Sequence, residues 1–286
     1  MKRRIDRSSA GISLADLLVV VVLIPLVLVM FLGCWRRHHG EGSGRVKCAS
    51  NLRQIGQAIL LYSNENRGAY PMTVYVGGPV VTPTWGTGAA AIDPFKAGGP
   101  GPNDVSAALF LLLRTQEITS EAFTCPSSNA EKWDFSGRTN TVLNWSNWPG
   151  RKGVLKHLSY SYQNPYADDG ALSAKPPFKL NNSVTAEFAV AADINPGTVG
   201  TDQNVLAVTS TSGARAMKQG NSRNHDGDGQ NVLYGDGHVE FQATPFCGIE
   251  RDNIYARRAA ASGLASGDVV NSPYDGNDNV LLPTDD

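Results

Sequence analysis

The feature that most constrains this chain is a long apolar run near its amino end. No side chain from residue 17 to residue 35 is charged, and almost every residue as far as 32 is apolar. A helix needs about 20 apolar residues to cross the ~30 Å hydrocarbon core of a bilayer, so the run predicts a transmembrane helix over residues 12–35. The rest of the chain is polar and mixed in composition, which predicts a folded head over residues 47–286.

Three interpretations of this amino-terminal region compete. A basic end followed by an apolar run is typical of a signal peptide or a plain membrane anchor. Cys34 follows a glycine at the end of the run, as in a lipoprotein, although Phe31 stands where leucine is usual. The third interpretation starts from Asp16, a carboxylate at the very start of the run, where an unpaired charge in lipid would cost about 3 kcal/mol.

Residues 11–17 (Gly-Ile-Ser-Leu-Ala-Asp-Leu) resemble the leader of type IV prepilins and pseudopilins. The resemblance implies that residues 1–11 are a leader peptide, which prepilin peptidase removes by cutting after Gly11. Ile12 would become the methylated first residue and Asp16 the fifth, where the family normally has Phe and Glu. The Asp16 carboxylate would then pair with the amino-terminus of a neighbouring subunit in an apolar filament core.

Residues 36–46 are rich in glycine, and each glycine costs about 1 kcal/mol in a helix relative to alanine. They are therefore expected to form a juncture that interrupts the helix. Residues 48–66 then predict an amphipathic helix, because its apolar residues recur at spacings of three and four. This stripe consists of Cys48, Leu52, Ile55, Ile59 and Tyr62. Asn51 is expected to lie off the stripe.

Residues 47–58 and 68–71 resemble the helix after the anchor in a large, planctomycete-type family of bacterial pseudopilin-like proteins. Residues 123–128 (Phe-Thr-Cys-Pro-Ser-Ser) are similar to a recurring element of that family. Its members also carry a carboxyl-terminal His, nine intervening residues and Asp-Gly. Here His225 is followed by ten residues before Asp236 and Gly237, one more than the pattern.

The remaining patterns predict an α+β fold that is pilin-like, with the amphipathic helix packed on an antiparallel β-sheet. Residues 105–113 predict a helix capped by Asn103 or Asp104. Gly-Asp-Gly between two alternating apolar runs predicts a hairpin over residues 231–241. Further strands are expected at residues 157–162, 188–192 and 205–208. The tryptophans at 133, 145 and 148 are expected to be core or loop-packing residues.

Asp226, Asp228 and Asp236 are candidate metal ligands. Oxygen ligands at alternating positions suit calcium, and the resemblance adds weight because major pseudopilins bind calcium in their carboxyl-terminal loops. No Glu occupies the twelfth position, so the segment is not an EF-hand. The competing interpretation is that Asp and Gly simply form turns here. A transition-metal site made of His225 and His238 is a third interpretation.

The four cysteines form no C-x-x-C pair, and Cys125–Cys247 is the candidate disulfide if the head is exported. No phosphate loop, dinucleotide fingerprint or nucleophile motif occurs, so no enzyme is expected. A formal net charge of −1 without a basic stripe gives no reason to expect nucleic acid as a partner.

The expected function is that of a pseudopilin-like structural protein in a type II secretion or type IV pilus-like system. Its expected partners are prepilin peptidase, other pseudopilin subunits and the inner-membrane secretion machinery. It would be a single-pass inner-membrane protein with its head exported to the periplasm or cell surface. The alternative is a membrane- or lipid-anchored monomeric surface protein whose head binds a ligand or partner.

Overall fold

The computed structural model describes residues 14–137, 139–199, 203–259 and 267–285. The chain divides into two units, residues 1–43 and residues 44–286. The expected cleavage point between Gly11 and Ile12 lies outside the described residues, and so does the side chain of Asp16. The first unit contributes the start of helix α1 (Leu14–Glu65), and the second contains all the other helices and strands that the structure describes.

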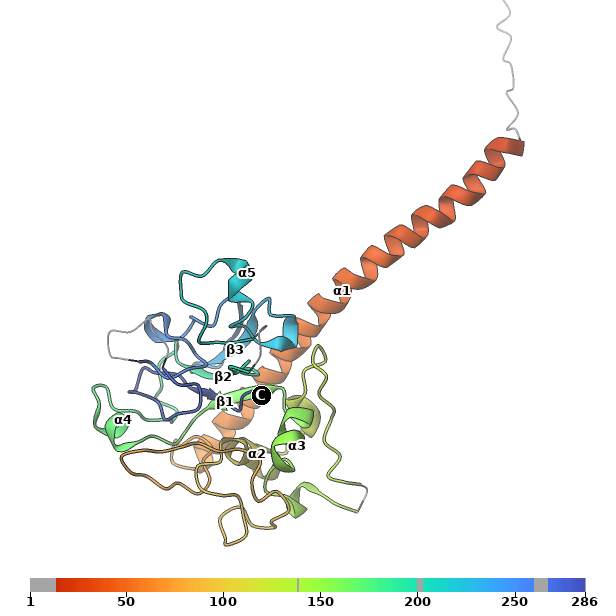
Figure 1. Cartoon of the computed structure of the whole chain (residues 1–286). Helices are drawn as coiled ribbons and strands as arrows, with labels where there is room; N and C mark the ends of the chain where they lie inside the picture. Colours follow the sequence, from red (N-terminus) through yellow and green to blue (C-terminus); the bar gives the residue numbers. More distant parts are fainter. Residues whose placement is uncertain (1–13, 138, 200–202, 260–266, 286) are drawn as a thin grey trace, which may run out of the picture. The chain divides into compact units, whose positions relative to one another are not determined.

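Helix α1 is continuous for 52 residues and contains Pro25 (Figure 1, red to orange). It passes through residues 36–46, so the expected interruption at the glycine-rich juncture is wrong. Each glycine lowers helix stability by only about 1 kcal/mol relative to alanine. Extending an existing helix needs no new nucleation, so the helix can continue through these residues. Gly44 also has a packing role, because a Cβ at this position would collide with the hydroxyl of Ser127.

In the first unit, the apolar side chains that the structure describes are about half exposed or more. They are Leu14, Leu17, Leu18, Val19, Val20, Val21, Val22, Leu23, Ile24, Leu26 and Val27. Within the described residues, no helix has a stretch long and apolar enough to cross a membrane.

In the second unit, the predicted apolar stripe of α1 is confirmed. Cys48, Leu52, Ile55 and Ile59 are all buried, and they join a core that includes α2 (Val105–Thr115). Asp104 caps α2 by accepting a hydrogen bond from the amide of Ala107 at 2.8 Å, as predicted. Gly56 allows α1 to approach the sheet closely, because a Cβ there would meet the side chain of Leu233.

The sheet has five antiparallel strands in the order β4-β3-β2-β1-β5. Their bounds are β1 (Tyr160–Gln163), β2 (Ala189–Asp193), β3 (Gln230–Tyr234), β4 (Val239–Gln242) and β5 (Leu281–Leu282). The predicted hairpin is confirmed as β3 and β4, and the predicted strand 188–192 is confirmed as β2. The fold is therefore α+β with an antiparallel sheet.

Other strand predictions need correction. Residues 205–208 form a turn and irregular structure instead of a strand, because the amide of Ala207 donates to the carbonyl of Asn204 at 3.0 Å; the Val205 side chain is buried against the sheet, whereas Leu206 is exposed. The strand expected from residue 157 begins at Tyr160, since helix α3 (Gly150–His157) continues to His157 and two residues connect it to the strand. The remaining short elements are η1 (Ser120–Phe123), η2 (Val142–Asn144), α4 (Asp169–Ser173), α5 (Ala214–Met217), η3 (Arg223–His225) and η4 (Ile249–Arg251).

Both faces of the sheet are covered, which explains why every residue of β2 and β3 is buried. One face packs on α1 and α2, through residues such as Tyr162 and Leu233. The other face packs on the carboxyl-terminal loops, where Tyr255 is fully buried. The tryptophans are packing residues, as predicted: Trp148 is fully buried, with its ring edge-to-face with Phe110 at 5.1 Å.

Candidate functional site

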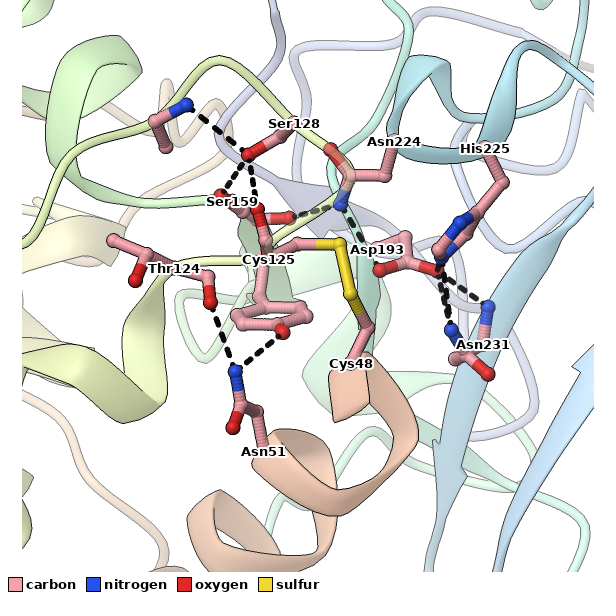
Figure 2. The surroundings of a disulfide bond; sticks show 12 residues. Cys48, Asn51, Thr124, Cys125, Ser128, Ser159, Asp193, Asn224, His225 and Asn231 are labelled. Carbon is pink, nitrogen blue, oxygen red and sulfur yellow. Dashed lines mark hydrogen bonds and ion pairs between the residues drawn. A yellow bond between two sulfur atoms is a disulfide. The ribbon is translucent and has the colours of Figure 1, made fainter. Parts of the chain in front are cut away.

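The most distinctive site in the head is a buried polar cluster built around a disulfide between Cys48 and Cys125 (Figure 2). The two Cα atoms are 5.1 Å apart, and the cysteines are 77 positions apart in sequence. The expected pair Cys125–Cys247 is wrong. The part of helix α1 from residue 44 onward belongs to the head, so it brings Cys48 to Cys125, whereas Cys247 is a free, half-buried thiol beside the core around Tyr255.

Helix α1 holds the segment around Cys125 through a second side chain. Asn51 lies three residues after Cys48, so both project from the same face of the helix. Its amide donates to the carbonyl of Thr124 at 2.8 Å and to the hydroxyl of Tyr160 at 3.2 Å. Asn51 is 1% exposed, so its expected position off the buried stripe is wrong. The bonds that it makes compensate for burying the amide.

Two serines and an asparagine connect this segment to the sheet. The hydroxyl of Ser128 donates to the carbonyl of Cys125 at 2.8 Å and lies 2.8 Å from the hydroxyl of Ser159. Asn224, from η3, donates from its side-chain amide to the carbonyl of Ser159 at 2.8 Å. These bonds fix the disulfide between α1, β1 and η3, which are far apart in sequence.

Asp193, at the end of β2, is the charged centre of the cluster and is fully buried. Asn231 donates to its Oδ2 twice, from the backbone amide at 2.6 Å and from the side chain at 3.0 Å. Asn224 donates to its Oδ1 at 3.0 Å. A buried carboxylate costs several kcal/mol unless donors replace its water, and these amides supply that replacement.

His225 is fully buried beside this carboxylate. Its Nε2 lies 3.2 Å from Oδ2 of Asp193 and 3.1 Å from the side-chain nitrogen of Asn231. Its Nδ1 is buried and has no hydrogen-bond partner in the part of the chain that the structure describes. Nε2 can donate to Asp193 or accept from Asn231, and in both tautomers Nδ1 stays unpartnered. The imidazole therefore has binding capacity that the protein does not use.

The four side chains of Cys48, Cys125, Asp193 and His225 each place one possible ligand atom within 4.8 Å of the others. Two sulfurs, one carboxylate oxygen and one imidazole nitrogen form a donor set typical of zinc proteins. While the disulfide is intact, neither sulfur is a thiolate, so this set can bind a metal only after reduction.

A polar cavity of about 650 Å³ adjoins the cluster. Ser128, Ser159 and Asn224 contribute to its wall, so it shares three residues with the cluster. Its lining also carries charges of both signs, including Lys218 and Asp285. This volume is large enough for a small polar molecule or a short segment of peptide.

The three carboxylates proposed as calcium ligands are not brought together. Asp228 forms ion pairs with Lys218 at 2.5 Å and Arg45 at 2.9 Å, and the bond from Lys218 is the main reason why its pKa is lowered. Asp226 is exposed just before β3 begins. Asp236 follows the end of β3, so a strand about 16 Å long separates it from the other two.

The His…Asp-Gly pattern divides into two unrelated parts. Asp236 and Gly237 form the β3–β4 turn, in which Gly237 has φ +87° and Asp236 accepts from the amide of His238 at 3.0 Å. That amide is the main reason why the pKa of Asp236 is lowered. His238 stacks on Tyr234 at this exposed turn and does not join His225 in a metal site.

Several segments singled out in the sequence meet at the cluster. Cys48 and Asn51 belong to residues 47–58, Cys125 to residues 123–128, and His225 begins the His…Asp-Gly pattern. Sequence reasoning missed Asp193. The available signal was a charged residue directly after the apolar run 188–192.

Comparison with models of protein families, with curated proteins and with solved structures finds no match for this chain.

Proposed function

We propose that this chain is a pseudopilin-like structural protein, cut after Gly11 by prepilin peptidase and assembled through its amino-terminal helix. The observation that carries the proposal is the continuity of α1 from Leu14 to Glu65. Its early part exposes apolar side chains, and its later part, within the head, is amphipathic and buries the stripe around Leu52. A subunit that assembles through one helix and presents a head on the same helix needs both parts: exposed apolar side chains that can contact neighbouring subunits, and a buried apolar stripe that packs in the head.

The mechanism that we propose for assembly is side-by-side packing of neighbouring apolar helices. Lipid tails are as apolar as these side chains, so van der Waals contacts between the valines and leucines of adjacent helices, and not removal of their surface from water, would favour a packed bundle. The Asp16 carboxylate would pair with the Ile12 amine of the neighbouring subunit and so set the register. Filaments of this kind belong to a type II secretion or type IV pilus-like system.

In this proposal residues 12–35 lie in the inner membrane and the head is exported. The apolar run in the sequence supports the anchor, and it includes positions whose side chains are outside the described part of the structure. The disulfide supports export, because such bonds persist in oxidising compartments and are rare in the cytosol.

One observation favours a second candidate function. The cavity of about 650 Å³ beside Ser128 and Asn224 would suit a monomeric, anchored surface protein whose head binds a small polar ligand. In that case the helix would serve as an anchor only, and Cys34 would be the expected attachment point for lipid.

Intact mass and amino-terminal sequencing of the protein from its native membrane test the proposal. A mature chain that begins at methylated Ile12 is expected, and Gly11→Val should leave the leader attached. Cys34→Ser is the matched control and should be processed normally. A lipidated chain beginning at Cys34, or an uncleaved Met1, would contradict prepilin processing.

Assembly is tested separately by cross-linking in the membrane. Asp16→Ala should abolish ladders of cross-linked subunits, whereas Asp16→Glu should retain them. Equal ladders from both variants would show that the carboxylate has no role in register.

A further inference from the structure

We propose that Cys48, Cys125, Asp193 and His225 form a zinc site when the disulfide is reduced. This site is independent of filament assembly and would exist in the chain before its cysteines are oxidised. In the folded head one side-chain cluster would thus have two stable forms, a disulfide and a zinc complex.

The geometry of the four ligand atoms supports a tetrahedral site. Zn–S bonds of about 2.3 Å and Zn–N or Zn–O bonds of about 2.0–2.1 Å give ligand-to-ligand distances of about 3.3–3.8 Å. The four atoms already lie within 4.8 Å of one another. Breaking the disulfide lets the two sulfurs separate towards that spacing, and the other ligand atoms need to move by only about 1 Å.

The chemistry balances with a dithiol as the reductant. The dithiol reduces the disulfide to two protein thiols and is itself oxidised to its own disulfide. Zinc then displaces one proton from each thiol, and both protons go to solvent. In the complex Asp193 binds as the carboxylate and His225 as the neutral imidazole. The complex carries a net charge of −1.

The surrounding amides are arranged as outer-shell partners of such a site. Asp193 can bind the ion through Oδ1, because each carboxylate oxygen has two lone pairs and Asn224 donates to one of them, while Asn231 donates to Oδ2. These donors would also offset the residual negative charge of the complex.

His225 supplies a second, independent observation. It is fully buried and its Nδ1 has no partner among the described residues. In a purely structural role, a buried nitrogen without a hydrogen-bond partner is unfavourable. Rotation of the ring would let one imidazole nitrogen bind zinc while the other accepts from or donates to the Asn231 and Asp193 pair.

The test uses the full chain in detergent, prepared oxidised or reduced with a dithiol that is then removed without oxygen. Cobalt and zinc are the probes. Reduced protein should bind about one zinc ion per chain in competition with a chromogenic chelator. With cobalt it should show a thiolate-to-metal charge-transfer band and the visible bands of a tetrahedral complex. Oxidised protein should bind neither metal.

Matched variants separate this site from adventitious binding. Cys48→Ser and His225→Gln should lose the zinc or bind it at least ~100-fold more weakly, and Cys48→Ser should weaken the charge-transfer band. Cys247→Ser and His238→Gln change the same residue types outside the cluster and should bind like the wild type. Asn231→Ala should weaken binding by about 10–100-fold.

Circular dichroism and protease resistance show whether the reduced chain is folded with and without zinc. If the reduced chain unfolds and zinc restores the fold, the proposal is supported, since metal binding then supplies folding free energy. If the reduced chain stays folded without binding zinc, or if zinc neither binds nor refolds it, the proposal is wrong. Equal binding by Cys48→Ser and Cys247→Ser would also overturn it.

Discussion

Replacing both cysteines of the disulfide should be among the most destabilising changes that can be made to the head. Cys48 and Cys125 are 77 positions apart, and in the chain-entropy treatment a disulfide that closes a loop of that length destabilises the unfolded state by about 4.5 kcal/mol at 25 °C. Alanine is the substitution to use, because both positions are buried and a serine hydroxyl would add the cost of a buried polar group.

The magnitude is best measured by urea unfolding of the full chain in detergent, with a chelator present to exclude metal. Tryptophan fluorescence is a suitable signal because Trp148 is fully buried between Phe110 and Phe123. The double variant should lose about 3–5 kcal/mol of unfolding free energy. Its dependence on urea should be steeper, because an unfolded chain without the cross-link exposes more surface.

Cys247→Ala is the matched control, since it removes a half-buried thiol that closes no loop. It should lose about 1 kcal/mol or less. The reasoning is refuted if the double variant loses less than about 1 kcal/mol, or if the Cys247 variant loses as much as the double variant. Either result would mean that the disulfide does not limit the unfolded chain in the way that its loop length implies.

Three further predictions concern single buried groups. Asn51→Ala should cost about 1–3 kcal/mol of unfolding free energy, because it leaves the Thr124 carbonyl without its donor, whereas exposed Gln54→Ala on the same helix should change it by less than about 0.5 kcal/mol; equal effects in urea unfolding would contradict this role. Burial raises the pKa of Asp278 to about 7 from 3.8, so its contribution to stability is full below pH 4 and is lost as pH rises through 7. Unfolding measured from pH 4 to 8 should show that decline, Asp278→Asn should flatten it, and an unchanged slope in the variant would count against it. Burial also raises the pKa of the Cys247 thiol to about 12, which lowers its thiolate fraction at pH 8 by about 1,000-fold; the higher nucleophilicity of that thiolate offsets part of this, so its alkylation in a Cys34→Ser background should be about 30–60-fold slower than that of an ordinary thiol. Mass spectrometry over time measures this rate, and rapid labelling of the folded protein would refute the burial argument.

Local patterns in the sequence predicted local structure well. The β3–β4 hairpin follows from Gly-Asp-Gly between two apolar runs, and the start of α2 follows from the capping carboxylate of Asp104. The buried stripe of α1 follows from the spacing of residues such as Leu52 and Ile55. In each case the residues that determine the structure are within a few positions of one another.

The cluster could not be predicted in the same way, because its contacts join residues that are far apart in sequence. Periodicity places Cys48 on a buried face but does not say which cysteine lies opposite. Asp193 has no local signal apart from its place after an apolar run, and its role depends on donors from η3 and β3. The predicted helix break at residues 36–46 was wrong for a related reason. Gly44 is needed because the distant Ser127 packs closely against it, and not because the helix breaks there.

The position of β5 has a consequence for the order in which the head can form during synthesis. Its two residues pair with Tyr162 and Gln163 of β1. Both cysteines of the disulfide have been synthesised by residue 125, but β1 keeps an open edge until residues 281–282 have left the ribosome. An open strand edge can pair with other chains, so a stalled or truncated product would be prone to aggregation or capture by chaperones. Pairing of β5 with β1 therefore closes this strand edge only after residues 281–282 have been synthesised.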